Sequence, residues 1–325
     1  MSGKFLLFVS LCIFFSCTER PAKNVGRFGC GAVPEFNSDS AFRYTGDQVS
    51  FGPRVPGTAS HDSCASYLVR RLAGFGFATT VQRTTVRLFD GTPIGISNIV
   101  GSFGTGNANR ILLCAHWDSR PYADRDPDPA SRGKAIDGAN DGAGSCGVLL
   151  EIARQVGLCG PSVGVDILFF DAEDWGEVNG DFAAGHYGTW CMGSDYWAGH
   201  PHTENYNAAF GILLDMVSGV DARFYREYFS MEYAPHVVDK VWRAARAAGY
   251  GRYFPDVLGG AIEDDHLPVN RRLGIPCIDI IQYDPGSATG FGDFWHTLDD
   301  DMEHVSVETM KAVGQTVLQV IYDEE

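Results

Sequence analysis

The stretch V-D-I-L-F-F-D-A-E-D, residues 165–174, joins an apolar run to three closely spaced acids. Residues 167–170 are typical of a buried strand, because continuous apolar side chains suit a strand covered on both faces. Asp171, Glu173 and Asp174 follow directly, and the carboxyl ends of strands in α/β folds border the crevice where ligands bind. Crowded carboxylates repel one another, so a bound divalent metal is the simplest way to hold them together, whereas such a run is more usually an ordinary acidic loop, and the rest of the chain decides between the two.

The remainder of the chain alternates strand-like and helix-like segments. Apolar or alternating runs predict strands, and apolar residues spaced by three and four predict helices of about 12–18 residues. This alternation predicts a single α/β domain with a central, mostly parallel, twisted sheet flanked by helices on both faces. The predicted strands are 79–88, 97–101, 110–115, 165–170, 208–217 and 275–282, and the predicted helices are 60–72, 142–156, 233–248 and 305–322.

Composition limits the classes of partner. The chain has 325 residues, of which 45% are hydrophobic and 20% charged, which is ample for one large core. The formal net charge of −16 and the pI of about 4.9 argue against nucleic acid, which binds basic surfaces. The same charge argues against electrostatic docking on anionic lipid. We expect a monomer.

The N-terminus predicts export. Lys4 precedes an apolar run at 5–15, which has the length of a signal-peptide core and is short for a membrane span. The run ends F-F-S-C, which resembles a bacterial lipoprotein site with Cys17 as the lipidated residue, although ordinary signal-peptidase cleavage is the alternative. We therefore expect a signal peptide at 1–16, a tether at 17–40 and a catalytic domain at 41–325. The protein is expected in the periplasm or anchored to the outer membrane, and a lipid anchor would be its membrane contact.

The cysteines outside the export segment divide into two groups. Cys114, Cys146 and Cys277 lie in apolar or Gly-rich contexts and are expected as buried thiols. The other four could pair, but their irregular spacing leaves the connectivity open: Cys30, Cys64, Cys159 and Cys191. No C-x-x-C pattern occurs, so a metal would not be bound by thiolates.

Several predicted strands end in histidine or carboxylate side chains. One lone residue of this kind is usually a hydrogen-bonded loop residue, but several at one end of a sheet favour a metal site. Histidine nitrogen with carboxylate oxygen is a typical zinc ligand set with an open position for catalysis. The segments are H-W-D-S at 116–119, D-G-A-N-D-G at 137–142, Glu173 with Asp174, Asp215, and W-H-T at 295–297.

The neighbouring acids Glu173 and Asp174 suggest a division of roles. Adjacent side chains diverge, so one carboxylate can bind a metal ion while the other stays free beside it. A free carboxylate next to a metal-bound substrate has the position that a general base needs.

The motifs in their order resemble one enzyme clan. H-W-D-S, G-A-N-D-G-A, F-F-D-A-E-D, L-L-D-M, E-D-D-H-L-P and F-W-H-T together resemble the zinc aminopeptidase clan. Within it they are most similar to glutaminyl-peptide cyclotransferases of the animal type, as found in some bacteria. The resemblance covers about residues 45–323.

The resemblance implies roles for particular residues. It implies one zinc ion per chain held by Asp141, Asp174 and His296, with Glu173 as the acid–base carboxylate. The animal enzymes have Glu where Asp174 stands, so the geometry at this ligand differs. The resemblance also implies two acids that hydrogen-bond near the reacting groups, Asp215 and Asp264. It implies aromatic pocket walls from Trp295, Phe291 and Trp190. His116 and Asp118 are expected behind the metal ligands.

The implied reaction is the zinc-dependent cyclisation of N-terminal glutaminyl residues of peptides or proteins to pyroglutamate, with release of ammonia. A zinc aminopeptidase stays open, because His116 and Asp215 could hold a second metal with Asp141 as the bridge. A non-catalytic surface-binding lipoprotein on the same scaffold is a third possibility, which would require the loss of a ligand or of the base. None of these residues is missing.

Overall fold

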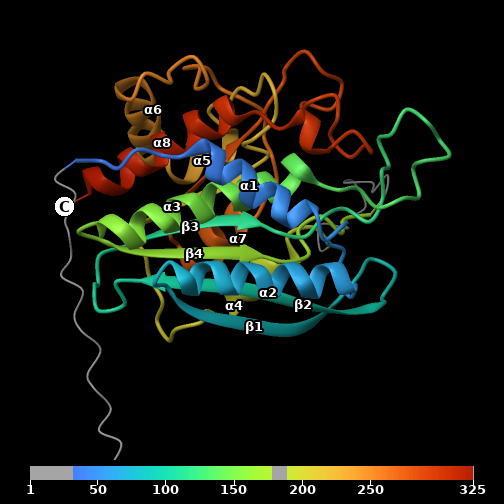
Figure 1. The fold of residues 1–325 in the computed structure, drawn as a ribbon, viewed down its shortest axis with the longest axis horizontal. Helices are drawn as coiled ribbons and strands as arrows, with labels where there is room; N and C mark the ends of the chain where they lie inside the picture. The colour runs from blue at the N-terminus through green and yellow to red at the C-terminus, as the bar shows by residue number, and fades with distance from the viewer. Residues whose placement is uncertain (1–31, 178–188, 325) are drawn as a thin grey trace, which may run out of the picture.

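A six-stranded mixed sheet is the centre of the structure, a computed structural model that describes residues 32–177 and 189–324 (Figure 1). The strand order is β1-β2-β4-β3-β5-β6. Strands β4, β3, β5 and β6 run parallel, and the β1–β2 hairpin continues the sheet in the antiparallel sense. The bounds are β1 Ala78–Arg87, β2 Pro93–Phe103, β3 Arg110–His116, β4 Gly164–Phe170, β5 Phe210–Asp215 and β6 Cys277–Ile281. The predicted, mostly parallel α/β sheet is confirmed.

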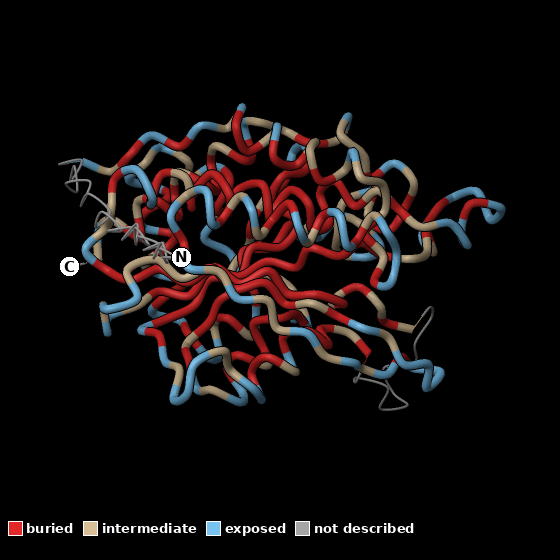
Figure 2. Tube along the Cα trace, turned by 60° about the horizontal axis from the view of Figure 1, so that its bottom comes forward, coloured by how far each residue is buried: buried red, intermediate tan, exposed pale blue. Residues whose placement is uncertain are grey.

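Burial along the strands follows their place in the sheet. Every residue of β4 and β5 is buried, as expected for parallel strands covered on both faces. Strand β1, at the edge, alternates between exposed and half-buried positions. Figure 2 shows the buried strands crossing the middle of the molecule, with exposed residues confined to its periphery.

Helices cover both faces of the sheet. One face packs against α1 Ser38–Val49, α2 Ala59–Gly74, α3 Ser145–Cys159, α6 Pro235–Ala247 and α8 Val307–Asp323 in one large apolar core. The opposite face packs against α4 Met192–Gly199 and the segment of α7 His266–Pro268 and η3 Val269–Leu273. The shorter helical elements are η1 Ala139–Gly144, α5 Tyr228–Tyr233 and η4 Met302–His304. Both faces are therefore shielded, which leaves the strand ends for a site.

Helix starts follow local side-chain chemistry. Thr58 caps α2 by accepting a hydrogen bond from the backbone of His61, and Ser306 caps α8 in the same way. Asn37 caps α1, whose few apolar residues gave no helical pattern in the sequence. The adjoining Phe36 is 1% exposed and packs in the core. The tether expected over 17–40 is therefore wrong at its C-terminal end, because the packed domain already includes residues 36–40.

Some predictions fall outside the described residues. These are the signal peptide, Cys17 with its lipidation, and Cys30. Among the residues that are described, Cys114, Cys146 and Cys277 are buried free thiols as predicted, and Cys64 and Cys191 are free and buried as well. Cys159 forms a disulfide bond.

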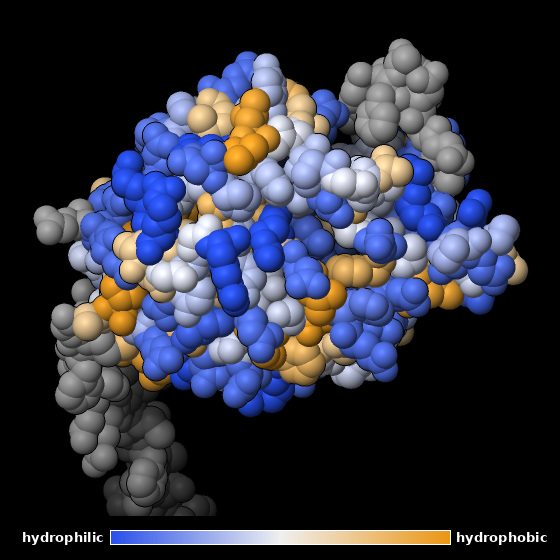
Figure 3. Space-filling model, turned by 90° about the horizontal axis from the view of Figure 1, so that it is seen from above, coloured by the Kyte–Doolittle hydropathy of each residue, from blue (hydrophilic) through white to orange (hydrophobic). Residues whose placement is uncertain are grey.

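Within residues 32–177 and 189–324, no helix combines the length and the apolar character needed to cross a membrane. On the face shown in Figure 3, hydrophilic residues dominate and apolar residues form small separate groups.

The buried Arg54 joins the N-terminal helices to the strand ends. Its guanidinium donates to the backbone carbonyls of Trp117, Asp137 and Gly138 at 3.0, 2.6 and 2.8 Å. Its own backbone N–H donates to the hydroxyl of Ser119 at 2.9 Å. Arg54 is 0% exposed, so water cannot take the place of its guanidinium as the donor to these carbonyls.

We predict that Arg54→Met lowers the free energy of unfolding by about 3 kcal/mol or more, because buried carbonyls left without a donor cost roughly 1–3 kcal/mol each. Urea unfolding followed by tryptophan fluorescence measures the change. Arg70→Met, at an exposed position of α2, is the matched control and should stay within about 0.5 kcal/mol of the parent. Equal stability of the two variants would refute this role.

Candidate active site

The parallel strands deliver acidic and histidine side chains to one edge of the sheet. His116 is the last residue of β3 and lies opposite Phe170, the last residue of β4. Asp171, Glu173 and Asp174 follow β4 directly, and Asp215 is the last residue of β5. Because parallel strands end on the same side, these groups meet at the carboxyl edge of the sheet.

Two groups of possible metal ligands share the carboxylate of Asp141. One consists of Asp141, Asp174 and His296, and the other of His116, Asp141 and Asp215. In each group the donor atoms lie within 4.8 Å of one another, and all five residues are buried. The sequence-derived ligands, which come from distant parts of the chain, are therefore brought together.

The first group has the geometry of a zinc site. His296 Nε2 lies 3.2 Å from Asp174 Oδ1 and 3.7 Å from Asp141 Oδ2. Ligand atoms on a tetrahedral zinc ion lie about 3.4 Å apart, as bond lengths of about 2.0–2.2 Å require. Asp174 is 1% exposed, and its Oδ2 has no hydrogen-bond partner among the described residues. These residues fit a zinc ion, which would satisfy a buried carboxylate that the protein leaves unpaired.

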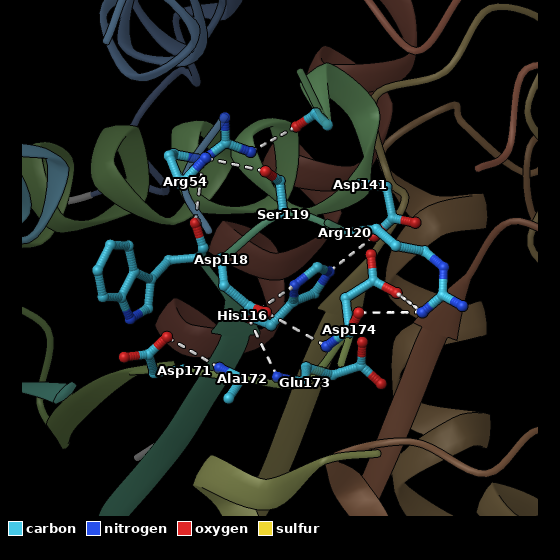
Figure 4. Close-up of polar contacts among 12 residues, drawn as sticks. Arg54, His116, Asp118, Ser119, Arg120, Asp141, Asp171, Ala172, Glu173 and Asp174 are labelled. Carbon is cyan, nitrogen blue, oxygen red and sulfur yellow. Dashed lines mark hydrogen bonds and ion pairs between the residues drawn. The ribbon is translucent and has the colours of Figure 1, made fainter. Parts of the chain in front are cut away.

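Glu173 lies beside this group without belonging to it. Asp118 accepts the backbone N–H groups of both Glu173 and Asp174, at 3.1 and 3.3 Å, and so fixes the turn from which the two acids diverge (Figure 4). Burial raises the pKa of Glu173 well above its usual value; His116 opposes the rise, and the neighbouring Asp264 adds to it. A carboxyl group with a raised pKa beside a metal site suits proton transfer near neutral pH.

Asp171 anchors the start of the same turn. Both of its oxygens lie 2.9 Å from Nε2 of His61, and it also accepts the backbone N–H groups of Ser97 and Ala172. The ring of His61 stacks on Trp117 at 4.2 Å. All the oxygens of Asp171 are thus engaged, which agrees with a structural role.

The loop that carries Asp141 is tied to the loop that carries His296. Asp300 accepts the backbone N–H groups of Asn140 and Asp141 at 2.7 and 3.2 Å. The backbone carbonyl of Asp300 accepts from Ala139 at 3.1 Å. Two ligands from different segments are therefore held in a fixed relation before any metal binds.

His116 bridges two carboxylates in the second group. Its Nε2 lies 2.8 Å from Asp141 Oδ1 and 3.1 Å from Asp215 Oδ1, and its Nδ1 lies 3.5 Å from Asp118 Oδ1. Burial lowers the pKa of His116, but the three neighbouring carboxylates outweigh burial and raise it well above its usual value. A protonated imidazole at this position would place a positive charge between Asp141 and Asp215.

A pocket of about 870 Å³ opens onto these groups. Trp190 lies parallel to the ring of His296 with 6.2 Å between centroids. Trp295 also stacks on the ring of His296, with 3.8 Å between centroids. Phe291 packs against Trp295 at 4.7 Å. The wall also includes the sequence-derived acids Glu173, Asp215 and Asp264. His116 and Asp118 do not line the pocket and lie behind its ligands.

Two charged residues of the site were missed by sequence reasoning. Arg120 donates to both oxygens of Asp124 at 2.6 and 3.1 Å, and to the backbone carbonyls of Asp174 and Gly176. Asp124 Oδ1 lies 3.3 Å from Nδ1 of His296. Arg120 and Asp124 therefore connect the candidate ligands Asp174 and His296. Their segment, rich in Pro, Asp and Arg, has no apolar periodicity, and only the shared position after a strand end could have signalled them.

The comparisons with known proteins agree with this geometry. The model of peptidase family M28 matches residues 98–321. The chain belongs to peptidase family M28. Members of this family fold as zinc-dependent exopeptidase-like α/β domains, as the neighbouring structures show.

Solved structures resemble the chain over nearly its whole length. A glutaminyl cyclase from Tannerella forsythia is 51% identical, with a TM-score of 0.87 over 90% of this chain and 100% of that one. A Zn-dependent exopeptidase from Parabacteroides distasonis ATCC 8503 is also 51% identical, with a TM-score of 0.88 over 90% and 100%. The glutaminyl-peptide cyclotransferase of Bos taurus is 22% identical over 293 residues, which are 82% of this chain and 77% of that protein. The chain is thus an enzyme of the glutaminyl-cyclase type.

We predict that Asp124→Asn weakens zinc binding about 10- to 100-fold, because carboxylates that orient metal-binding histidines have effects of this size. Titration against a chelator of known affinity measures the change. Asp128→Asn is the control in the same loop, because Asp128 is exposed and contacts Ala130 and Ser131 of its own loop. An unchanged affinity in Asp124→Asn would show that Asp124 does not support His296.

Proposed function

We propose that the protein cyclises N-terminal glutaminyl residues of peptides to pyroglutamate, with release of ammonia and with one zinc ion per chain. The arrangement of Glu173 beside the group of Asp141, Asp174 and His296 carries the proposal. Support comes from the glutaminyl cyclases among the relatives. The site contains a candidate metal ligand set and a separate, half-buried base, as this reaction requires.

The pocket suits an N-terminal residue. Its floor is acidic, with Glu173, Asp215 and Asp264 buried or half-buried, so a protonated α-amine is attracted to it. The aromatic rings of Trp190, Trp295 and Phe291 provide apolar walls for the aliphatic part of a glutaminyl side chain. A peptide with Gln at its N-terminus offers both the amine and the side chain.

The chemistry needs an activated amide and one proton carrier. Zinc held by Asp141, Asp174 and His296 would polarise the carbonyl of the side-chain amide and make its carbon electrophilic. As a carboxylate, Glu173 accepts a proton from the neutral form of the α-amine as the amine nitrogen forms the new bond to that carbon. Glu173 then returns the proton to the departing nitrogen, and ammonia leaves. Because the nucleophile is tethered to the electrophile, positioning supplies much of the rate.

The acids around Glu173 complete the site. Asp215 and Asp264 line the same pocket and present oxygen atoms that can accept N–H groups of the bound residue. These contacts orient the amine toward the amide.

The second ligand group supports one metal rather than two. Nε2 of His116 lies at hydrogen-bond distance from one oxygen of Asp141 and one of Asp215, at 2.8 and 3.1 Å, so the imidazole can link the two carboxylates without a second metal. These carboxylates raise the pKa of His116, and a proton on its ring would compensate their charge. An aminopeptidase with two metals, suggested by the exopeptidase among the relatives, would have to displace that proton.

The cellular setting is also a proposal. The signal-like segment at 1–16 and Cys17 support export and lipid anchoring, and the acidic composition supports a monomeric enzyme that meets peptides rather than nucleic acid. Labelling with a radioactive fatty acid, with and without Cys17→Ala, tests the anchor.

We predict that the purified, zinc-loaded protein releases ammonia from a Gln-initiated peptide and fails to hydrolyse a Leu-initiated chromogenic substrate. Ammonia and released amine are measured in separate assays on the same preparation. Metal analysis should give about one zinc per chain. Hydrolysis of the Leu substrate with two zinc ions per chain would replace the proposal with the aminopeptidase.

Glu173→Gln should lower kcat at least 100-fold, because a positioned general base contributes about 10²- to 10⁴-fold to the rate. Zinc should stay bound, because Glu173 does not belong to the group of Asp141, Asp174 and His296. Asp174→Ala should lose the zinc as well as the activity. Turnover and bound zinc are measured on both variants. The control is Glu204→Gln, at an exposed position outside the pocket, which should keep both. Near-normal turnover of Glu173→Gln would contradict the assignment of the base.

A further inference from the structure

Cys191 contacts the catalytic carboxylate of the proposed reaction. Its Sγ lies 3.3 Å from Oε1 of Glu173, with the thiol as the donor. The residue is 7% exposed and does not line the pocket, so it approaches Glu173 from behind, inside the protein. Neither the metal ligand set nor the proposed proton transfer accounts for this thiol.

The backbone holds Cys191 against the same turn. Its N–H donates to the carbonyl of Glu173 at 3.0 Å, and the N–H of Met192 donates to the carbonyl of Ala172 at 3.1 Å. Backbone and side chain of Cys191 thus both contact Glu173. Because these contacts fix the two segments relative to each other, the thiol has one position with respect to the carboxylate.

The conformation of Cys191 is unusual in a way that points to the site. Its backbone φ is +55°, a left-handed conformation that residues other than glycine and asparagine rarely adopt. Among the described residues, the other non-glycine residues with positive φ include Ala172, directly before Glu173, Met216, directly after Asp215, and the ligand His296. Strained backbone of this kind persists where the surroundings enforce it, and it concentrates at active sites. Cys191 belongs to this set.

The surroundings keep the thiol protonated. Burial raises the pKa of Cys191 well above its usual value, and the nearby carboxyls of Glu173, Asp265 and Asp264 raise it further. An S–H group can donate one hydrogen bond, and Glu173 Oε1 is the acceptor at hydrogen-bond distance. The thiol therefore acts as a neutral donor and not as a nucleophile.

We propose that Cys191 is a positioning residue whose thiol holds Oε1 of Glu173 and leaves Oε2 free to exchange the substrate proton. The proposal rests on the proposed function, because it assigns a partner to the base of that reaction. The neutral donor suits the position. A lysine there would form an ion pair with the base and hold it as a carboxylate, whereas a thiol orients the group without adding charge.

A metal-binding role for Cys191 is the competing explanation. The donor atoms of Glu173, Cys191 and Asp264 lie within 4.8 Å of one another. A metal ion there would need the thiolate and would occupy an oxygen of Glu173 that the base uses. A protonated thiol hydrogen-bonded to Glu173 does not provide that ligand.

Two substitutions separate the roles. Cys191→Ala removes the donor, and we expect kcat on a Gln-initiated peptide to fall about three- to tenfold, with KM changed less than twofold. Cys191→Ser keeps a donor and should restore kcat to within about twofold of the parent. Cys64→Ala and Cys64→Ser are the matched control pair, because Cys64 is a buried free thiol away from the pocket, and kcat should not change.

Bound zinc and the thermal midpoint are measured on every variant. The proposal requires about one zinc per chain in the parent and in both Cys191 variants. A kcat in Cys191→Ala equal to that of the parent would overturn it, as would equal losses in Cys191→Ala and Cys191→Ser. Two zinc ions in the parent that fall to one in Cys191→Ala would make the thiol a ligand. If Cys191→Ala unfolds, Cys191→Ser against Cys191→Val, which fills the space without a donor, decides the question. A parent enzyme that releases no ammonia would refute the proposed function instead.

Discussion

Electrostatic repulsion among buried carboxyl groups at the carboxyl ends of β3, β4 and β5 is the constraint on which this structure depends. Asp118, Asp174 and Asp215 lie buried at or within four residues of these strand ends, and η1 brings the buried Asp141 beside them. Burying an ionised carboxylate without a partner is costly, so each must meet positive charge, a proton or N–H donors. The protein supplies Arg120, the imidazole of His116 and backbone N–H groups, and it leaves one oxygen of Asp174 for a metal ion.

This compensation also rigidifies the site. The carboxylates of Asp118 and Asp300 accept hydrogen bonds from the backbone of the turns that carry Asp174 and Asp141. These bonds hold loops without regular structure in fixed positions. Arg54 fixes the backbone behind them from a separate part of the chain. The candidate metal ligands and the proposed base are thereby positioned before substrate arrives, which is the arrangement that makes electrostatic catalysis effective. Left-handed residues such as Ala172 and His296 are the local cost of aiming side chains into one small volume.

The sequence could predict most of the sheet, because the apolar runs at β3, β4 and β5 have no other stable placement than a covered sheet. It could also predict that acids after those strands meet, since parallel strands share one end. It could not predict α1, whose burial depends on a few residues such as Tyr44 with no helical apolar stripe. Arg120 and Asp124 escaped for a related reason: their contacts are made in space, and nothing in an irregular, polar segment reveals a tertiary partner.

The short ligand Asp174 shows how the two parts of the site depend on each other. A side chain one methylene shorter than glutamate reaches a common metal position only if its backbone lies closer to that position. Arg120 donates to the backbone carbonyls of Asp174 and Gly176 while gripping Asp124, which faces His296. The same guanidinium packs over the ring of Trp190, at 4.7 Å from the centroid. The buried guanidinium of Arg120 thus contacts the shorter candidate ligand Asp174, the carboxylate of Asp124 beside His296, and the pocket wall at Trp190. These contacts would hold the backbone of Asp174 close enough for aspartate to take the place of the longer acid.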